Sequence, residues 1–200
     1  MNQKDQKGIF EGFSFRKKGM IYISIPKKKV DVITLNNRSG DIKMHDIATK
    51  NIVISNDSGA EKIEGLSANK GNFTSKDGEL SLKDSSFKEL TVASTTGDNY
   101  ITSITSPKTK ITSTDGEVSI KDIVEGKSLF VETKSGDIAV SYKEAPTSLM
   151  LTANSNSSDI TVNLNNFKKE MDTGKSKEGT IGATSNKLEV LSKEGTIKIN

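Results

Sequence analysis

Short apolar stretches with a spacing of two residues recur along the chain, on both sides of tight turns that contain glycine. The first five turn glycines lie at positions 40, 59, 78, 97 and 116, so the four steps between them are equal. The next steps are slightly longer: Gly136 comes next, Ser158 then takes the place of the glycine, and Gly195 ends the series. A spacing of two is the period of a β-strand. The pattern predicts strand–turn–strand repeats and almost no helix.

Apolar side chains take the same places in most repeats. They stand seven and five residues before the turn glycine, as in Ile52 and Ile54, and two and four residues after it, as in Leu80 and Leu82. Three residues before the turn position stands a small polar residue, which alternation directs inward. These eight residues, here called the polar column, are Asn37, Asn56, Ser75, Ser94, Ser113, Thr133, Ser155 and Ser192. We expect them to hydrogen-bond to one another and to the turn backbone.

Repeats that share a register cannot each bury their apolar face alone, but stacked coils can. We therefore predict an all-β fold, a single-domain parallel β-solenoid of about nine coils with about 19 residues per coil. Parallel crossovers are right-handed by default, so the solenoid is expected to be right-handed and β-helix-like.

The two ends of the chain depart from the repeat. Residues 1–19 are predicted to form a polar tail and a cap, in which Phe13 and Phe15 cover the first coil. Residues 20–200 form the solenoid, with a first strand around Ile21, Ile23 and Ile25. The pattern breaks at about 165–184, which we interpret as an excursion or a degenerate coil. No capping element follows the last apolar pair, Ile197 and Ile199, so an open strand edge is predicted there.

Composition excludes several classes of protein. Only 32% of residues are hydrophobic, the mean hydropathy is −0.50, and no apolar run approaches a membrane-spanning length. The chain has no cysteine and a single histidine, His45. These counts exclude disulfide scaffolds, thiol nucleophiles, zinc–thiolate sites and multi-histidine metal sites. A net charge of +3 with 28% charged residues does not favour nucleic acid as a partner. We predict no metal and no cofactor.

Carboxylates recur directly after the turn position. In five consecutive repeats this position holds Glu79, Asp98, Glu117, Asp137 and Asp159, here called the acidic edge. Stacked at coil spacing, such a line is a candidate for binding a cation or for the paired carboxylates of glycoside chemistry. Asp and Glu beside Gly are also ordinary turn residues. We therefore name the acidic edge as a candidate binding site and assign no catalytic residue.

Two of the turns carry a motif that resembles a known family. Ser39-Gly40-Asp41-Ile42 and Ser135-Gly136-Asp137-Ile138 are similar to the SGDI-type strand repeats of the bacterial DUF4097 family of adhesin-type proteins. The closing stretch from Leu188 to Ile197 is also similar to the family's final strand pair. The resemblance covers about residues 20–200. It implies a β-solenoid at or outside the bacterial membrane, and it brings no catalytic residues.

The leading hypothesis is a non-enzymatic cell-envelope or surface module, either binding or structural. It would present an extended solenoid face to an envelope protein or a wall polymer. One alternative is a polysaccharide-active β-helix enzyme that uses the acidic edge. Another is a cytoplasmic regulatory protein that stacks with itself through the edge of the C-terminal coil. The expected location is extracytoplasmic, or cytoplasmic if the sequence as given is complete.

Overall fold

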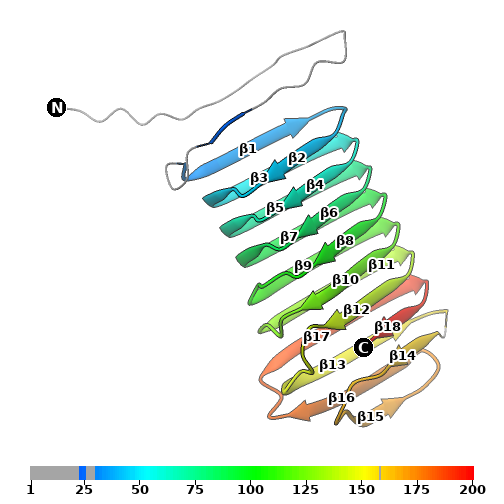
Figure 1. Cartoon of the computed structure of the whole chain (residues 1–200). Coiled ribbons are helices and arrows are strands. Elements are labelled where there is room, and N and C mark those ends of the chain that lie inside the picture. Colours follow the sequence, from blue (N-terminus) through cyan, green and yellow to red (C-terminus); the bar gives the residue numbers. More distant parts are fainter. Residues whose placement is uncertain (1–22, 26–29, 158) are drawn as a thin grey trace.

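The computed structural model describes residues 23–25, 30–157 and 159–200, and in these residues every regular element is a β-strand. Each coil adds one long strand to one sheet and a shorter strand to a second sheet (Figure 1). The second sheet has eight strands, and the first has ten because a hairpin extends it. We call these the long sheet and the short sheet. The prediction of a parallel β-solenoid with about 19 residues per coil is confirmed. The described residues contain no helix that is long and apolar enough to cross a membrane.

The long sheet has the order β1-β3-β5-β7-β9-β11-β17-β13-β16-β15, and the short sheet has the order β14-β18-β12-β10-β8-β6-β4-β2. The strands of the long sheet are β1 (Val32–Asn37), β3 (Ala48–Ser58), β5 (Ser67–Asp77), β7 (Ser86–Thr96), β9 (Lys108–Asp115), β11 (Ser128–Ser135), β13 (Ser148–Ser155), β15 (Lys168–Asp172), β16 (Ser176–Gly182) and β17 (Asn186–Glu194). Those of the short sheet are β2 (Ile42–His45), β4 (Glu61–Glu64), β6 (Leu80–Lys83), β8 (Asn99–Thr102), β10 (Val118–Ile123), β12 (Ile138–Tyr142), β14 (Ile160–Val162) and β18 (Ile197–Ile199).

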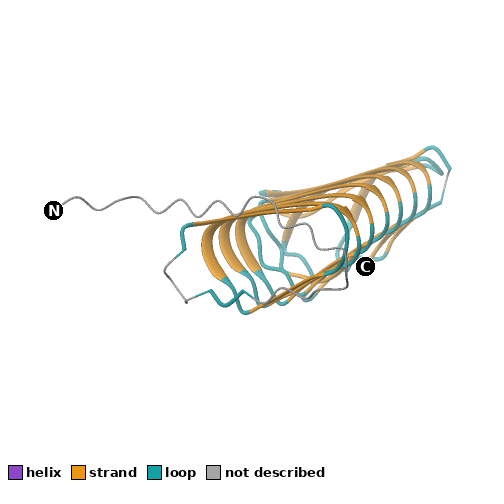
Figure 2. Ribbon diagram, turned by 90° about the horizontal axis from the view of Figure 1, so that it is seen from above, coloured by secondary structure: helices purple, strands orange, loops and turns teal. Residues whose placement is uncertain are grey.

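The register between coils follows the spacing of the turn glycines. Ile33 lies beside Ile52, and Ile52 beside Gly71, so each residue pairs with its equivalent in the next repeat. Between β9 and β11 the offset is longer by one position, as the step from Gly116 to Gly136 requires. Seen from above, successive coils repeat the same flattened outline (Figure 2). Equivalent side chains therefore stack in columns about 4.8 Å apart.

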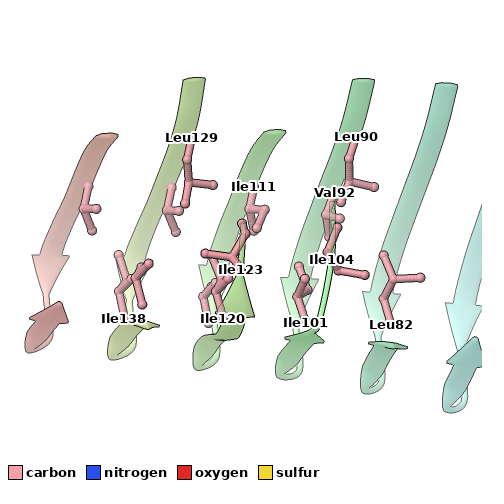
Figure 3. Packing of buried hydrophobic residues seen from close by; sticks show 14 of the residues in the cluster. Leu82, Leu90, Val92, Ile101, Ile104, Ile111, Ile120, Ile123, Leu129 and Ile138 are labelled. Atoms are coloured by element: carbon pink, nitrogen blue, oxygen red, sulfur yellow. The ribbon is translucent and has the colours of Figure 1, made fainter. Parts of the chain in front are cut away.

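The core lies between the two sheets, where the inward apolar pairs meet. Figure 3 shows Leu90 and Val92 of the long sheet facing the interior from the opposite side to Ile101 of the short sheet. Most core side chains are no more than 1% exposed. The core is filled almost entirely by Ile, Leu and Val, with Phe73 and Phe87 in edge-to-face contact. Aliphatic side chains suit this narrow interior, and burying each one contributes about 1.5–3 kcal/mol.

Only the first six coils stack in chain order. The strands β1–β12 form what we call the rod, which ends at Tyr142. The strands β13–β18 form a second group, here called the cap, in which β17 and β18 lie between the last coil of the rod and the coil of β13 and β14. Figure 1 shows the C-terminus inside the stack. With the two coils of the cap, the described residues contain eight coils rather than about nine.

The predicted open edge at Ile197 and Ile199 is therefore wrong. Strand β18 pairs with β12 on one side and β14 on the other, and both isoleucines are buried. The excursion at 165–184 is an antiparallel hairpin, β15–β16, which continues the long sheet beyond β13. Gly179 of this hairpin leaves room for the ring of Phe167. The excursion thus supplies the end cover that the sequence pattern did not reveal.

The predicted first strand is only partly within the described residues. Residues 23–25 are not in a strand, Ile23 is 59% exposed, and the first strand of the described residues begins at Val32. Pro26 follows directly and cannot donate a backbone hydrogen bond to a sheet. The predicted tail and cap at 1–19, with Phe13 and Phe15, lie outside the described residues.

Candidate functional site

Two aspartates of the acidic edge, Asp98 and Asp137, bind the backbone of the neighbouring coil. Asp98 Oδ1 accepts a hydrogen bond from the backbone N–H of Glu117 at 2.8 Å, and Asp137 Oδ1 accepts one from Thr196 at 2.7 Å. Asp41, which precedes the predicted set, does the same for Ala60 at 3.0 Å. These carboxylates satisfy turn amides that strand pairing leaves free. This part of the edge is a connection between coils.

The glutamates differ from the aspartates. Glu79 and Glu117 are exposed, and their carboxylates make no hydrogen bond or ion pair with any described residue. The hydroxyl of Tyr100 donates to Asp98 Oδ2 at 3.2 Å. Partial burial, this hydrogen bond and the charges of Asp98, Glu117 and Glu79 together raise the pKa of Tyr100. The glutamates therefore add negative potential to an open surface rather than forming a closed site.

The acidic edge is shorter than predicted. Asp137 and Asp159 are not neighbours, because β18 lies between their strands and places Thr196 between them. The structure thus brings four carboxylates together in consecutive coils, Glu79, Asp98, Glu117 and Asp137, and separates the fifth. Within the described ranges, no group of three acidic or histidine side chains is arranged to hold a metal ion. His45 lies on the surface, with its Nε2 atom 3.4 Å from Glu64 Oε2.

A buried carboxyl, Glu61, lies in the apolar interior, and sequence analysis did not single it out. Glu61 occupies the position two residues after Gly59, between Ile42 and Leu80 of the adjacent coils, and is 1% exposed. Its Oε2 has no hydrogen-bond partner among the described residues. Burial raises its pKa to about 7, against a smaller lowering by Asn56 of the polar column. The sequence does contain a sign of this buried carboxyl: Glu61 is charged, whereas the same position in most other repeats is apolar.

The polar column forms many of the predicted hydrogen bonds, but the buried Ser75 Oγ has no partner among the described residues. Asn37 Nδ2 donates to Asn56 Oδ1 at 2.8 Å, and Asn56 Nδ2 donates to the carbonyl of Gly59 at 2.8 Å. Ser94 Oγ donates to Ser113 Oγ at 3.1 Å. Most turn groups that these side chains bind are carbonyls, although Ser155 Oγ also accepts a hydrogen bond from the backbone N–H of Ser157 at 3.2 Å. The column is therefore structural, since some of its hydrogen bonds join neighbouring coils and others hold a side chain to its own turn.

A second carboxylate, Glu125, joins the rod to the cap. Its two oxygens accept hydrogen bonds from the backbone N–H groups of Thr147 (2.8 Å) and Ser148 (3.1 Å) and from Asn186 Nδ2 (3.1 Å). Burial alone would raise the pKa of Glu125, but these hydrogen bonds outweigh it and hold the pKa below its ordinary value. Beside it, Thr105, Pro107, Val124 and Lys127 line an open hollow of about 230 Å³.

Comparison with known proteins places this architecture in a family. A family model described as Toastrack DUF4097 matches residues 1–200. The chain belongs to the Toastrack family. This is a β-solenoid family of unknown function. No curated protein and no solved structure matches the chain. The Toastrack match confirms the family resemblance seen in the SGDI-type turns.

In this Toastrack chain, the two kinds of carboxylate on the acidic edge can be told apart by substitution. We expect Asp98→Ala to lower the free energy of unfolding by about 1 kcal/mol, because a backbone N–H loses its acceptor. Glu117→Ala removes the same charge but no hydrogen bond, and is expected to change stability by less than about 0.5 kcal/mol. Urea unfolding followed by circular dichroism measures both. Equal losses would mean that charge, and not the connection between coils, determines the role of these acids.

Loss of the Glu125 carboxylate should loosen the Toastrack cap. We expect Glu125→Ala to destabilise the junction by about 2 kcal/mol, since several hydrogen bonds are lost together. Because the folded-state pKa is lowered, this contribution is present above the ordinary carboxyl pKa and is lost as the pH falls through the folded value. Hydrogen exchange at β17 and proteolysis between 143 and 147 report the effect. Glu144→Ala, at an exposed position in the same segment, is the control and should leave both unchanged.

Proposed function

We propose that this chain is a non-enzymatic binding or structural module of the bacterial cell envelope, of adhesin type. It presents one flat face of the solenoid to an envelope protein or a wall polymer. The observation that carries this proposal is the continuity of the long sheet, whose outward residues keep one register through eight parallel strands. Membership of the Toastrack family supports the β-solenoid architecture on which this proposal depends.

The proposed contact face is the outer side of the long sheet. Seven coil spacings give it a length of about 34 Å. Its outward positions include short polar side chains, among them Asn36, Ser55, Asn72, Thr74, Thr91 and Thr112. Between them stand charged residues, such as Glu89 with its ion-pair partners Lys70 and Lys108, and a few apolar ones, such as Val53. Short side chains lose little rotamer entropy when a partner covers them. Such a surface suits an extended partner that makes many weak contacts along several coils.

The acidic edge gives one border of the contact face a negative charge. The carboxylates of Glu79 and Glu117 bind no other described residue and lie at the turn side of the coils, next to the aspartates that link the coils. A partner that runs along the contact face would meet this negative border on one side. Cationic groups of the partner would then set its direction and its rate of association more than its affinity.

The first experiment is protease shaving of intact cells, followed by detection with an antibody against this domain. Loss of the domain while the membrane is unbroken supports an outward-facing envelope module. Survival until lysis contradicts the envelope location. The second experiment measures binding of the purified chain to isolated cell envelopes and to wall polymer.

The variant for the binding experiment carries Ser55→Glu, Thr74→Glu and Thr112→Glu on the contact face. The matched control carries the same three charges on the short sheet, as Ser81→Glu, Thr102→Glu and Thr161→Glu. We expect the first variant to lose binding and the control to retain it, whereas single alanine changes on the contact face have little effect. The choice of face would be overturned if only the control variant lost binding, or if a single alanine change abolished binding.

A further inference from the structure

The cap is a self-contained group of strands. Strand β13 pairs with β17 on one side and with β16 on the other, β16 pairs with β15, and β14 pairs with β18. These pairings join four strands in the long sheet and two in the short sheet without the rod, and β14 contacts β13 and β16 across the interior. The cap contacts the rod chiefly through β17 on β11 and β18 on β12, with Glu125 at the corner.

The covalent connection and the docking face of the cap lie on different strands. The chain enters the cap at β13, but the strand that contacts the rod is β17, which lies between β13 and β11. Residues 143–147, here called the linker, therefore pass the height of two coils, about 10 Å. The linker reads Lys-Glu-Ala-Pro-Thr. Proline at position 146 disfavours helical backbone at Ala145, so the linker cannot coil into a helix. Pro146 is buried, and Thr147 donates its backbone N–H to Glu125 at the end of the linker.

The two docking faces complement each other fully. Seven residue pairs join β11 to β17, and three join β12 to β18. On the rod, Leu129 and Val131 of β11 are buried, and on the cap, Leu188 and Val190 of β17 are 0% exposed. Separation would uncover apolar side chains and an unpaired strand edge on both bodies. An undocked cap therefore has to dock again, on its own rod or on an identical one.

From these observations we propose that the cap is exchanged between two copies of this chain, each cap docking on the rod of the other. The exchange restores every contact between rod and cap, including the hydrogen bond of Asn186 to Glu125, and alters only the linker. Exchange of an identical element is a low-cost route to a dimer. A linker of five residues spans at most about 17 Å, so the corners of the two rods at Glu125 must adjoin.

The absence of cysteine from the sequence makes the exchange directly testable. Glu132 of β11 and Leu191 of β17 lie side by side across the seam and are half-buried. One full-length variant carries Glu132→Cys and a second carries Leu191→Cys. The two are unfolded together, refolded at high protein concentration and oxidised. Cα atoms of adjacent strands are close enough for a disulfide.

We expect a disulfide-linked dimer from this mixture. The control mixture combines Thr74→Cys with Ala93→Cys, which are also side by side but within the rod. It should give no linked dimer, because the rod strands are not exchanged. A single chain that carries both Glu132→Cys and Leu191→Cys verifies the geometry by closing within one molecule. If that chain closes and the mixture gives no dimer, the proposal is overturned.

Linker length provides an independent test. Deletion of Glu144 and Ala145 leaves three residues with a reach of about 10 Å, barely the distance to be crossed. We expect this variant to be dimeric by light scattering, and a variant with six added Gly and Ser residues to be monomeric. A monomer from the shortened linker, or a dimer without the seam disulfide, would show that copies do not exchange caps.

Discussion

Replacing Gly97 by alanine is expected to lower the free energy of unfolding by about 3–5 kcal/mol. A Cβ atom at this position would lie 2.1 Å from the carbonyl oxygen of Gly78 in the neighbouring coil, a backbone atom that cannot move aside alone. The φ angle of Gly97 is also +103°, which is unfavourable for an L-residue. Both effects act in the middle of the rod, so the coils on either side are disturbed. The midpoint of urea unfolding measures the loss.

Gly40 is the matched control for this substitution. Its φ angle is +102°, but no described atom lies within 4 Å of a Cβ built there. Gly40→Ala should therefore cost only the backbone strain, about 1–2 kcal/mol. The difference between the two variants is the cost of separating stacked turns. If both lose the same stability, close stacking of the turns contributes nothing.

Replacing Glu61 by leucine is expected to raise the free energy of unfolding by about 3 kcal/mol at pH 8 and to change it little near pH 4.5. The folded-state pKa of Glu61 is raised to about 7, so the folded chain holds a proton that the unfolded chain releases at lower pH. Stability of the native sequence therefore falls as the pH rises from about 4.5 to 7. A leucine at position 61 cannot ionise, so the variant does not lose stability as the pH rises. It is also the residue found at the paired position in the next coil, Leu80.

Urea unfolding at several pH values between 4.5 and 8 tests this prediction. Glu79→Leu is the control, because it removes an exposed carboxylate one turn further along and should leave the pH dependence unchanged. Glu61→Gln should also abolish the pH dependence but stabilise less, since a buried polar group remains. A native chain whose stability is constant over this range, or a Glu61→Leu variant with an unchanged slope, would contradict the assignment.

The repeat could be predicted from sequence because each coil encodes the same register locally. Ile52 and Ile54 face inward for the same reason as Leu90 and Val92, namely that two-residue alternation beside a fixed turn leaves one choice. The inward direction of the polar column could be predicted from the same alternation. These predictions required no knowledge of which coils are neighbours.

The order of the last coils could not be predicted in this way. Leu149 and Leu151 of β13 and Leu188 and Val190 of β17 have the same pattern, so either pair fits beside Val131. The choice depends on the linker and on the hairpin at 168–182, whose pairing is antiparallel and has no repeat. For the same reason, the predicted position of Asp159 next to Asp137 was wrong, since β18 lies between their strands. The role of Glu125 was missed because its partners are 22, 23 and 61 residues away.

The position of β18 has a mechanical consequence. In a solenoid whose final coil is outermost, tension on the end of that coil peels its hydrogen bonds one at a time. Here a pull on Asn200 loads two ladders at once, because β18 is bonded to β12 through Ile138 and Tyr142 and to β14 through Asp159 and Asn163. Both must shear together before the strand moves. The C-terminal strand is therefore anchored against force more firmly than an outermost coil would be.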